Sequence, residues 1–115
     1  MSNKNVLRLL SSLGFRSCYA GYWYLAEVLQ LLVYDHVLTQ KLSSAYQVVA
    51  SDYNVSIQAV RNGIRKEILR YWTSYQDATW NLIVHKPIVT PTNEDIILAL
   101  CDHLNNEKHE KRESH

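Results

Sequence analysis

The sequence predicts an all-α fold, a compact bundle of about six helices that contains a helix-turn-helix. Apolar residues recur at three- and four-residue spacing along most of the chain, and no segment alternates as a half-buried strand does. Both prolines fall within residues 85–91, so they interrupt only one predicted connection. With 115 residues, 47% of them hydrophobic, the chain can form one domain with its own core. We expect this domain at residues 1–106, followed by a charged, disordered tail at 107–115.

Two apolar stripes predict the first two helices. The first stripe ends at Gly14, which favours the left-handed backbone of a helix C-terminus, and consists of Val6, Leu9, Leu10 and Leu13. The second helix is predicted over residues 21–34, and its buried side consists of Tyr22, Leu25, Leu29 and Leu32. Residues 35–40 then form a connection or one short turn, and Ser43 or Ser44 starts the next helix.

Residues 46–72 predict two helices joined by a tight turn. Ala50 is small enough to lie where the two helices cross. Asn54 stands at the turn, where its short polar side chain tolerates a left-handed backbone. Ser56 is a good N-cap for the second helix, which ends at about Trp72. The apolar residues expected to close the small core around the crossing are Val49, Tyr53, Val55 and Val60.

The second helix of this pair has one apolar and one polar face. The apolar face, expected to point inward, consists of Val60, Ile64, Ile68, Tyr71 and Trp72. The polar face consists of Gln58, Arg61, Asn62, Arg65, Lys66 and Arg70. Side chains of Arg, Asn and Gln can hydrogen-bond base edges in a major groove, while Arg and Lys can hold phosphates. The alternative is an ordinary amphipathic helix whose basic face is only solvated.

The C-terminal third predicts a short helix, a loop and a final helix. The short helix is predicted over residues 76–84, and residues 85–91 form a loop of extended character because they hold both prolines. Thr92 and Asp95 stand at capping-box spacing and predict the start of the last helix. The apolar residues of that helix are Ile96, Ile97, Leu100, Cys101 and Leu104.

The net charge of the chain is only +1, but its basic residues are unevenly distributed. Residues 46–72 hold four basic and two acidic side chains, whereas residues 73–104 hold one basic and four acidic ones. The positive field is therefore expected around the basic helix face. Such a local basic face on a nearly neutral domain suits sequence-specific binding better than indiscriminate coating of nucleic acid.

Neither a metal site nor an active site is predicted. The histidines lack metal-ligand spacing; they are His36, His85, His103, His109 and His115. Cys101 and His103 are two residues apart and would point to different sides of a helix. Since no glycine-rich phosphate loop is present either, we expect no enzyme, no cofactor and no small-molecule substrate.

Compartment and redox state follow from what the chain contains. No targeting segment is visible and no apolar run is long enough to cross a bilayer, which predicts a cytoplasmic, nucleoid-associated protein without a membrane partner. Cys18 and Cys101 show no disulfide framework and are expected to be buried free thiols.

A cluster of aromatic residues at 19–24 could form a partner surface or a base-stacking platform. We expect Tyr22 to pack in the core and Trp23 to be exposed.

Four elements of the chain, taken together and in order, are characteristic of one family. They are Leu-Leu-Ser-Ser-Leu-Gly at 9–14, Gly-Tyr-x-Tyr-Leu at 21–25, the ungapped stretch 46–72, and Pro-Thr-Asn at 91–93 with the isoleucines that follow. Through them nearly the whole chain resembles the C-terminal DNA-binding domain of the master response regulators of sporulation initiation, the stage zero sporulation protein A family.

This resemblance implies an all-helical domain that binds promoter boxes of the TGTCGAA type, either in tandem on the DNA or as a homodimer. In full-length family members a phospho-acceptor receiver domain precedes it. Because Met1 stands directly before the region of resemblance, we expect a stand-alone domain without a receiver.

The predicted reading helix departs from the family pattern. The family's Ser-Arg-Val-Glu-Arg-Ala run is Gln-Ala-Val-Arg-Asn-Gly here, at residues 58–63. Ala59 cannot make a bidentate guanine contact, and Arg61 reverses the charge of a Glu. Since each bidentate contact contributes about 1–3 kcal/mol of discrimination, the preferred box is expected to differ. Gly63 costs about 1 kcal/mol relative to Ala within a helix, but would let the backbone approach DNA closely.

The leading prediction is a transcriptional regulator that inserts residues 57–72 into the major groove of double-stranded DNA, at a box related to TGTCGAA. The residues predicted to read bases are Gln58, Arg61 and Asn62. The residues predicted to hold phosphates are Ser56, Arg65, Lys66 and Arg70. The alternative is a protein-interaction module or antagonist that pairs with a full-length sporulation regulator without specific DNA reading; the residues at 59 and 62 keep this alternative open.

Overall fold

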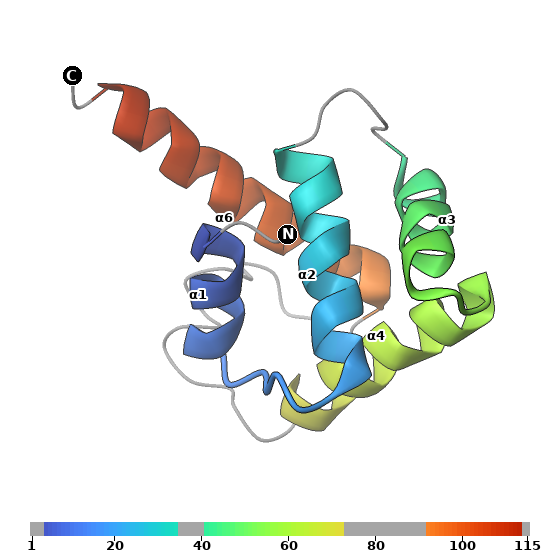
Figure 1. Cartoon of the computed structure of the whole chain (residues 1–115). Coiled ribbons are helices and arrows are strands. Elements are labelled where there is room, and N and C mark those ends of the chain that lie inside the picture. Colours follow the sequence, from blue (N-terminus) through green and yellow to red (C-terminus); the bar gives the residue numbers. More distant parts are fainter. Residues whose placement is uncertain (1–3, 35–40, 73–91, 114–115) are drawn as a thin grey trace.

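The computed structural model describes residues 4–34, 41–72 and 92–113, which form five helices and, within these ranges, no strand (Figure 1). The helices are α1 (Lys4–Ser12), α2 (Ala20–Val33), α3 (Leu42–Tyr53), α4 (Ile57–Trp72) and α6 (Asn93–Glu113). The predicted all-α class is confirmed. The short helix predicted over 76–84, the loop over 85–91 and the connection over 35–40 lie outside the described residues. None of the described helices is both long and apolar enough to span a bilayer.

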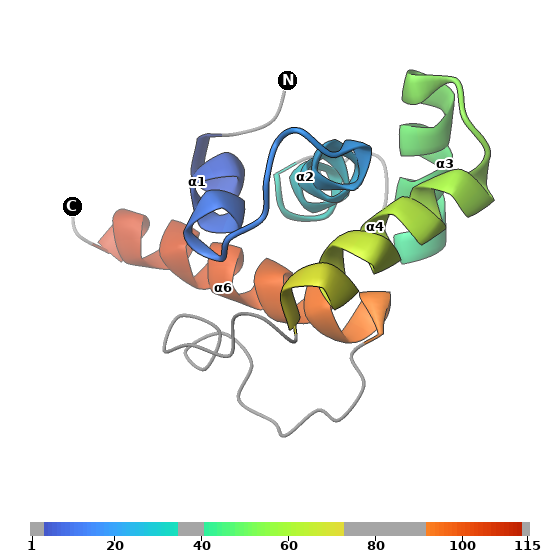
Figure 2. The same ribbon diagram turned by 90° about the horizontal axis from the view of Figure 1, so that it is seen from below.

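Helix α2 lies at the centre and contacts each of the other four helices (Figure 1, Figure 2). Nine of its fourteen residues are buried, as expected for a helix that is apolar on nearly all sides. Helix α1 covers one side of α2 and the α3–α4 pair the other, while α6 crosses beneath them (Figure 2). This arrangement leaves the outer side of α4 uncovered by any described helix.

The crossing of α2 and α4 brings two glycines close together. A Cβ atom on Gly21 would collide with the carbonyl oxygen of Gly63, and a Cβ on Gly63 would lie 2.9 Å from the Tyr24 ring. Gly63 therefore lies on the inner side of α4, against α2. Our expectation that Gly63 lets the backbone approach DNA is wrong, because the close approach it permits is between two helices of the same domain.

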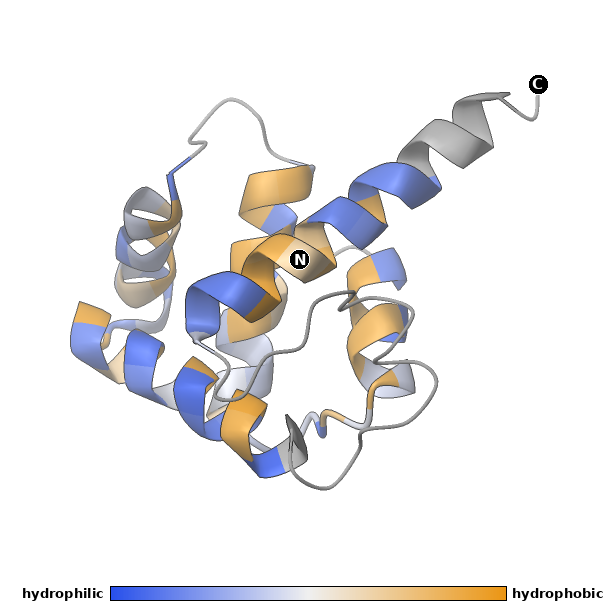
Figure 3. Cartoon of the chain, turned by 180° about the vertical axis from the view of Figure 1, so that it is seen from behind, coloured by the Kyte–Doolittle hydropathy of each residue, from blue (hydrophilic) through white to orange (hydrophobic). Residues whose placement is uncertain are grey.

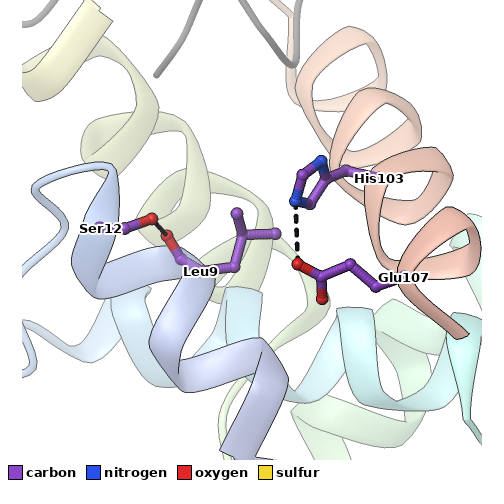
Figure 4. A network of polar contacts seen from close by, with 4 residues as sticks. All are labelled: Leu9, Ser12, His103 and Glu107. Atoms are coloured by element: carbon purple, nitrogen blue, oxygen red, sulfur yellow. Dashed lines mark hydrogen bonds and ion pairs between the residues drawn. The ribbon is translucent and has the colours of Figure 1, made fainter. Parts of the chain in front are cut away.

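The helix ends that are predicted for the N-terminal part of the chain agree closely with the structure. Gly14 has a φ of 96°, the left-handed conformation expected after the first stripe. Ser12 closes the same turn, since its hydroxyl donates to the Leu9 carbonyl oxygen over 2.7 Å (Figure 4). Helix α3 begins slightly before the predicted serines, at Leu42, and Lys41 at its N-cap makes no capping side-chain hydrogen bond.

Helix α6 is longer than the sequence pattern indicates. It continues to Glu113, so the part of the predicted disordered tail at 107–113 is helical. Among the residues of α6 up to 107, whose burial is described, Leu104 is the last buried one. Beyond it the sequence consists mostly of Glu, Lys and Arg, which are good helix formers. His103 Nε2 lies 3.2 Å from Glu107 Oε1, one turn further along (Figure 4). The division of the chain at residue 106 stays a prediction.

The core matches most of the predicted apolar faces. Val49, Val60, Ile64 and Ile68 are buried, as expected. Tyr22 is buried and Trp23 is exposed, also as expected, with the Trp23 indole N–H donating to the Ser17 carbonyl oxygen over 2.8 Å.

Two burial predictions are wrong. Cys101 is buried as predicted, whereas Cys18 is exposed, because it lies in the turn between α1 and α2 and on no apolar stripe. Tyr53 was expected in the core of the α3–α4 crossing, but it is 43% exposed. As the last residue of α3, it is carried to the edge, where its ring packs edge-on against Tyr24.

Candidate nucleic-acid interface

The turn between α3 and α4 has the geometry that the sequence predicts. Asn54 adopts φ 55° and ψ 48°, the left-handed conformation, and is the one such non-glycine residue in the described chain. The Val55 N–H donates to the Ala50 carbonyl oxygen over 2.9 Å, which satisfies an end of α3. Ala50 is buried at the crossing, where a larger side chain would hold the helices apart. The left-handed Asn54 and the Val55–Ala50 hydrogen bond thus end α3 and lead directly into α4.

Helix α4 begins on the cap that the sequence predicts. The Ser56 hydroxyl oxygen accepts the Ala59 N–H over 3.0 Å, three residues into the helix. Ser56 remains exposed, so its hydroxyl proton is available to an acceptor outside the domain.

The outer side of α4 is polar and accessible. Figure 3 shows hydrophilic residues on the side of α4 that faces away from the bundle. The exposed residues on it include five of the predicted contact residues, Gln58, Arg61, Asn62, Arg65 and Lys66. The Gln58 amide donates to the Asn62 amide oxygen over 3.2 Å, so these two side chains lie side by side. We refer to these five residues and Ser56 as the α4 outer face.

Arg61 is supported by residues of two other helices. Its guanidinium carbon lies 5.8 Å from the centroid of the Tyr46 ring on α3. Its backbone carbonyl oxygen accepts a hydrogen bond of 3.0 Å from the side-chain amide of Asn93, the first residue of α6. The same amide donates to the Tyr46 hydroxyl oxygen over 3.3 Å. Three helices therefore meet beneath Arg61.

Arg70 occupies a different environment from the other basic residues of α4. Its guanidinium carbon lies 3.8 Å from the centroid of the Tyr19 ring, before α2, and its Nε lies 3.9 Å from Glu67 Oε1. Arg70 thus connects the C-terminal end of α4 to the start of α2. Nothing in these contacts tests its predicted role in holding a phosphate, and half of its side chain remains accessible.

Glu67 is a buried acidic residue that the sequence interpretation missed. It is 2% exposed, on the inner side of α4, and its Oε2 has no hydrogen-bond partner among the described residues. Burial raises the pKa of its carboxyl group, while the nearby Arg70 lowers it. The sequence spacing could have predicted the burial of Glu67, because residue 67 follows Val60 and Ile64 on the same apolar face.

The Pro-Thr-Asn element begins α6 as predicted. The Thr92 hydroxyl oxygen accepts the Asp95 N–H over 3.1 Å, and an Asp95 carboxylate oxygen accepts the Thr92 N–H over 3.3 Å. This reciprocal pair is a capping box. It holds Asn93 at a defined position, pointing toward α3 and α4.

No group of three or more potential metal ligands occurs within the described ranges. The α4 outer face consists of amide, hydroxyl and basic side chains, so it offers hydrogen-bond donors and positive charge.

Residues 6–104, most of the chain, match the family described as sporulation initiation factor Spo0A C terminal. None of the curated proteins matches the chain.

Proposed function

Because the chain belongs to the family of Spo0A C-terminal domains, which are DNA-binding effector domains of response regulators and not catalytic domains, we propose that it is a sequence-specific transcriptional regulator. In this proposal α3 and α4 are the two helices of a helix-turn-helix. Helix α4 enters the major groove of double-stranded DNA at a promoter box. Such a protein acts in the cytoplasm, on the nucleoid.

The observation that carries the proposal is the α4 outer face. It combines a capped helix N-terminus with amide and guanidinium donors, and it is covered by none of the described helices. Recognition helices place the residues of their N-terminal half against base edges. We therefore assign base reading to Gln58, Arg61 and Asn62.

We assign the phosphate contacts to the remaining predicted contact residues. Arg65 and Lys66 lie one turn further along the outer face, where they would meet the backbone of the DNA. Ser56 can donate its hydroxyl proton to a phosphate while its oxygen caps α4. The Arg70 guanidinium already lies over the Tyr19 ring and beside Glu67, so we expect its contribution to be the smallest of the four.

The proposed box is related to TGTCGAA but altered. Ala59 lies in the exposed first turn of α4 and has no side chain that could read a guanine. Arg61 supplies a guanidinium two positions later in the helix. The base pair that Arg61 contacts can therefore differ from the one that an arginine at position 59 would read. Whether two copies bind in tandem or as a homodimer depends on the spacing of the selected boxes.

The test is selection of bound sequences from a random DNA pool at near-physiological salt, followed by titration of the selected duplex against a scrambled one. We expect a consensus that binds at least about a hundredfold more tightly than the scrambled duplex. Affinity should fall steeply with salt, because each neutralised phosphate releases counterion.

The matched variants are Arg61→Ala and Arg8→Ala. Arg61→Ala should lower affinity for the selected duplex by about tenfold or more, the range for one base contact. Arg8 is exposed on α1, so Arg8→Ala should leave it unchanged. Absence of any enriched sequence, together with salt-insensitive association with a full-length sporulation regulator, would replace the proposal with the protein-interaction module.

A further inference from the structure

Asn93 is the point at which α6 joins the reading helix. It follows the cap residue Thr92 and stands 32 positions after Arg61, yet its side-chain amide nitrogen donates to the Arg61 carbonyl oxygen over 3.0 Å. The second amide proton is directed to the Tyr46 hydroxyl oxygen, at 3.3 Å. One amide group therefore spans α6, α4 and α3.

The orientation of this amide is determined by its partners. The carbonyl oxygen of Arg61 can only accept, so the amide nitrogen and not its oxygen must face α4. Asn93 Oδ1 is buried without a hydrogen-bond partner in the described part of the chain. A buried acceptor left unpaired costs about 1–3 kcal/mol, and the two donated bonds are what offsets that cost.

The Tyr46 ring provides a fixed surface beneath Arg61. The side chain is 4% exposed, and burial raises the pKa of its hydroxyl, an effect that the Asn93 hydrogen bond and the Arg61 charge oppose. Because the hydroxyl is tied to Asn93, the ring cannot turn freely. Its face, which carries partial negative charge, is presented to the guanidinium 5.8 Å away.

We propose that Asn93 is a positioning residue for DNA reading, which sets the base preference of Arg61 through the Tyr46 ring and the Arg61 backbone. This inference rests on the proposed function, since it specifies how one base-reading side chain is held. An exposed arginine on a bare helix samples many rotamers, and ordering it on binding costs about 0.5–1.5 kcal/mol. Support from the ring and the amide before binding reduces that cost for one geometry, and so for one base.

The experiment compares Asn93→Ala and Asn93→Asp with the unmodified chain in titrations of the selected duplex and of duplexes changed at each base pair. Asn93→Asp keeps the shape of the side chain and adds a negative charge that the start of α6 tolerates, but it loses both donors. We expect both variants to lower the ratio of affinities for the selected and changed duplexes roughly three- to tenfold, the range for losing hydrogen bonds of this kind.

Two comparisons separate positioning from general destabilisation. In an Arg61→Ala background, Asn93→Ala should leave the ratio unchanged, because the residue that it positions is gone. Thr92→Ala, which removes the adjacent cap but keeps the Asn93 amide, should lower the stability of the fold without altering the ratio. An equal effect of Asn93→Ala with and without Arg61 would overturn the inference.

A measurement without DNA distinguishes failure of this inference from failure of the proposed function. Nitrogen relaxation of the Arg61 Nε–H group reports its order, and exposed Arg65 on the same helix is the internal comparison. Asn93→Ala should lower the order of Arg61 and leave that of Arg65 unchanged. If Arg61 is no more ordered than Arg65 in the unmodified chain, positioning is refuted even where specific DNA binding is found. If the order is lost as expected but no DNA is selected, the support of Arg61 by Asn93 stands, and the proposed function fails together with the base preference that rests on it.

Discussion

At the scale of single residues, the two glycines at the α2–α4 crossing have unequal surroundings. The added Cβ of Gly21 would meet backbone, the Gly63 carbonyl oxygen, and also the Cγ of buried Glu67 at 2.5 Å. The added Cβ of Gly63 would come too close only to the edge of the Tyr24 ring, because the Gly21 Cα lies at an ordinary 3.6 Å. The Tyr24 ring lies at the border of the core beside exposed Tyr53. A ring can shift by a few tenths of an ångström where a helical carbonyl cannot.

This difference predicts unequal costs for two identical changes. Gly21→Ala should lower the free energy of unfolding by about 3 kcal/mol, the upper part of the range for overpacking. Gly63→Ala should change it by at most about 1 kcal/mol, because the gain in helix propensity offsets the displaced ring. Urea titration of both variants measures the two values. Equal losses would mean that the crossing adjusts as easily on one side as on the other.

At the scale of elements, the relation between α3 and α4 depends on the backbone of Asn54. Its left-handed conformation reverses the chain direction within a single turn. The residues next to it in the chain would adopt this backbone conformation only at a higher free-energy cost. The angle between the helices in turn determines which side of α4 faces outward. A defect at this turn would therefore disturb the α4 outer face while leaving its residues unchanged.

Substitution of Asn54 separates conformation from side-chain chemistry. Asn54→Ala should destabilise the fold by about 1 kcal/mol, since alanine resists a positive φ. Asn54→Gly adopts that φ without strain and should stay within about 0.5 kcal/mol of the unmodified chain. Chemical denaturation monitored by circular dichroism gives both numbers. A glycine variant as unstable as the alanine variant would show that the amide side chain matters more than the conformation.

At the scale of the whole molecule, two acidic residues of different helices share a site. The partly buried carboxyl group of Glu27 on α2 lies near the carboxyl group of Asp52 on α3. Burial is the largest cause, and the neighbouring Asp52 carboxyl group adds to it, so that the pKa of Glu27 is raised from 4.5 to about 7. A raised acid pKa favours the folded state most strongly at low pH. That contribution is lost as the pH rises from 4.5 to about 7.

The consequence is a protein that becomes less stable as the pH rises toward neutrality. Glu27→Gln keeps a hydrogen-bond donor for Asp52 without the charge, so it should stabilise the fold above pH 8 by on the order of 1 kcal/mol, a value reduced for partial exposure to solvent. It should also flatten the dependence of stability on pH between 4.5 and about 7. Thermal unfolding across this range measures both effects. Asp102→Asn, exposed on α6, is the control and should leave the slope intact. An unchanged slope in Glu27→Gln would contradict the raised pKa of Glu27.

Local chemistry was readable from the sequence wherever a single residue or one helix period decides the outcome. Asn54 at the turn, Ser56 and Thr92 at the helix starts, and Gly14 at a helix end all act on backbone within a few residues of themselves. The inward stripe of α4 was readable for the same reason, since a period of 3.6 residues defines a face. The outer face follows as its complement, so the candidate contact residues could be named in advance, although their DNA contacts stay predictions.

Only the tertiary structure decided which of these residues meet. Gly63 lies against Gly21, Asn93 donates to the Arg61 carbonyl oxygen, Arg70 covers the Tyr19 ring and Glu27 lies near Asp52. In each pair the two residues are too far apart in sequence for a helical period to connect them. Tyr53 and Cys18 were misplaced because Tyr53 is the last residue of α3 and Cys18 lies in the turn between α1 and α2, so neither is turned toward the core. Composition and spacing determine a helix and its faces through local backbone energetics. Which faces come together is decided by the packing of the whole bundle, because burial is a property of all the helices at once.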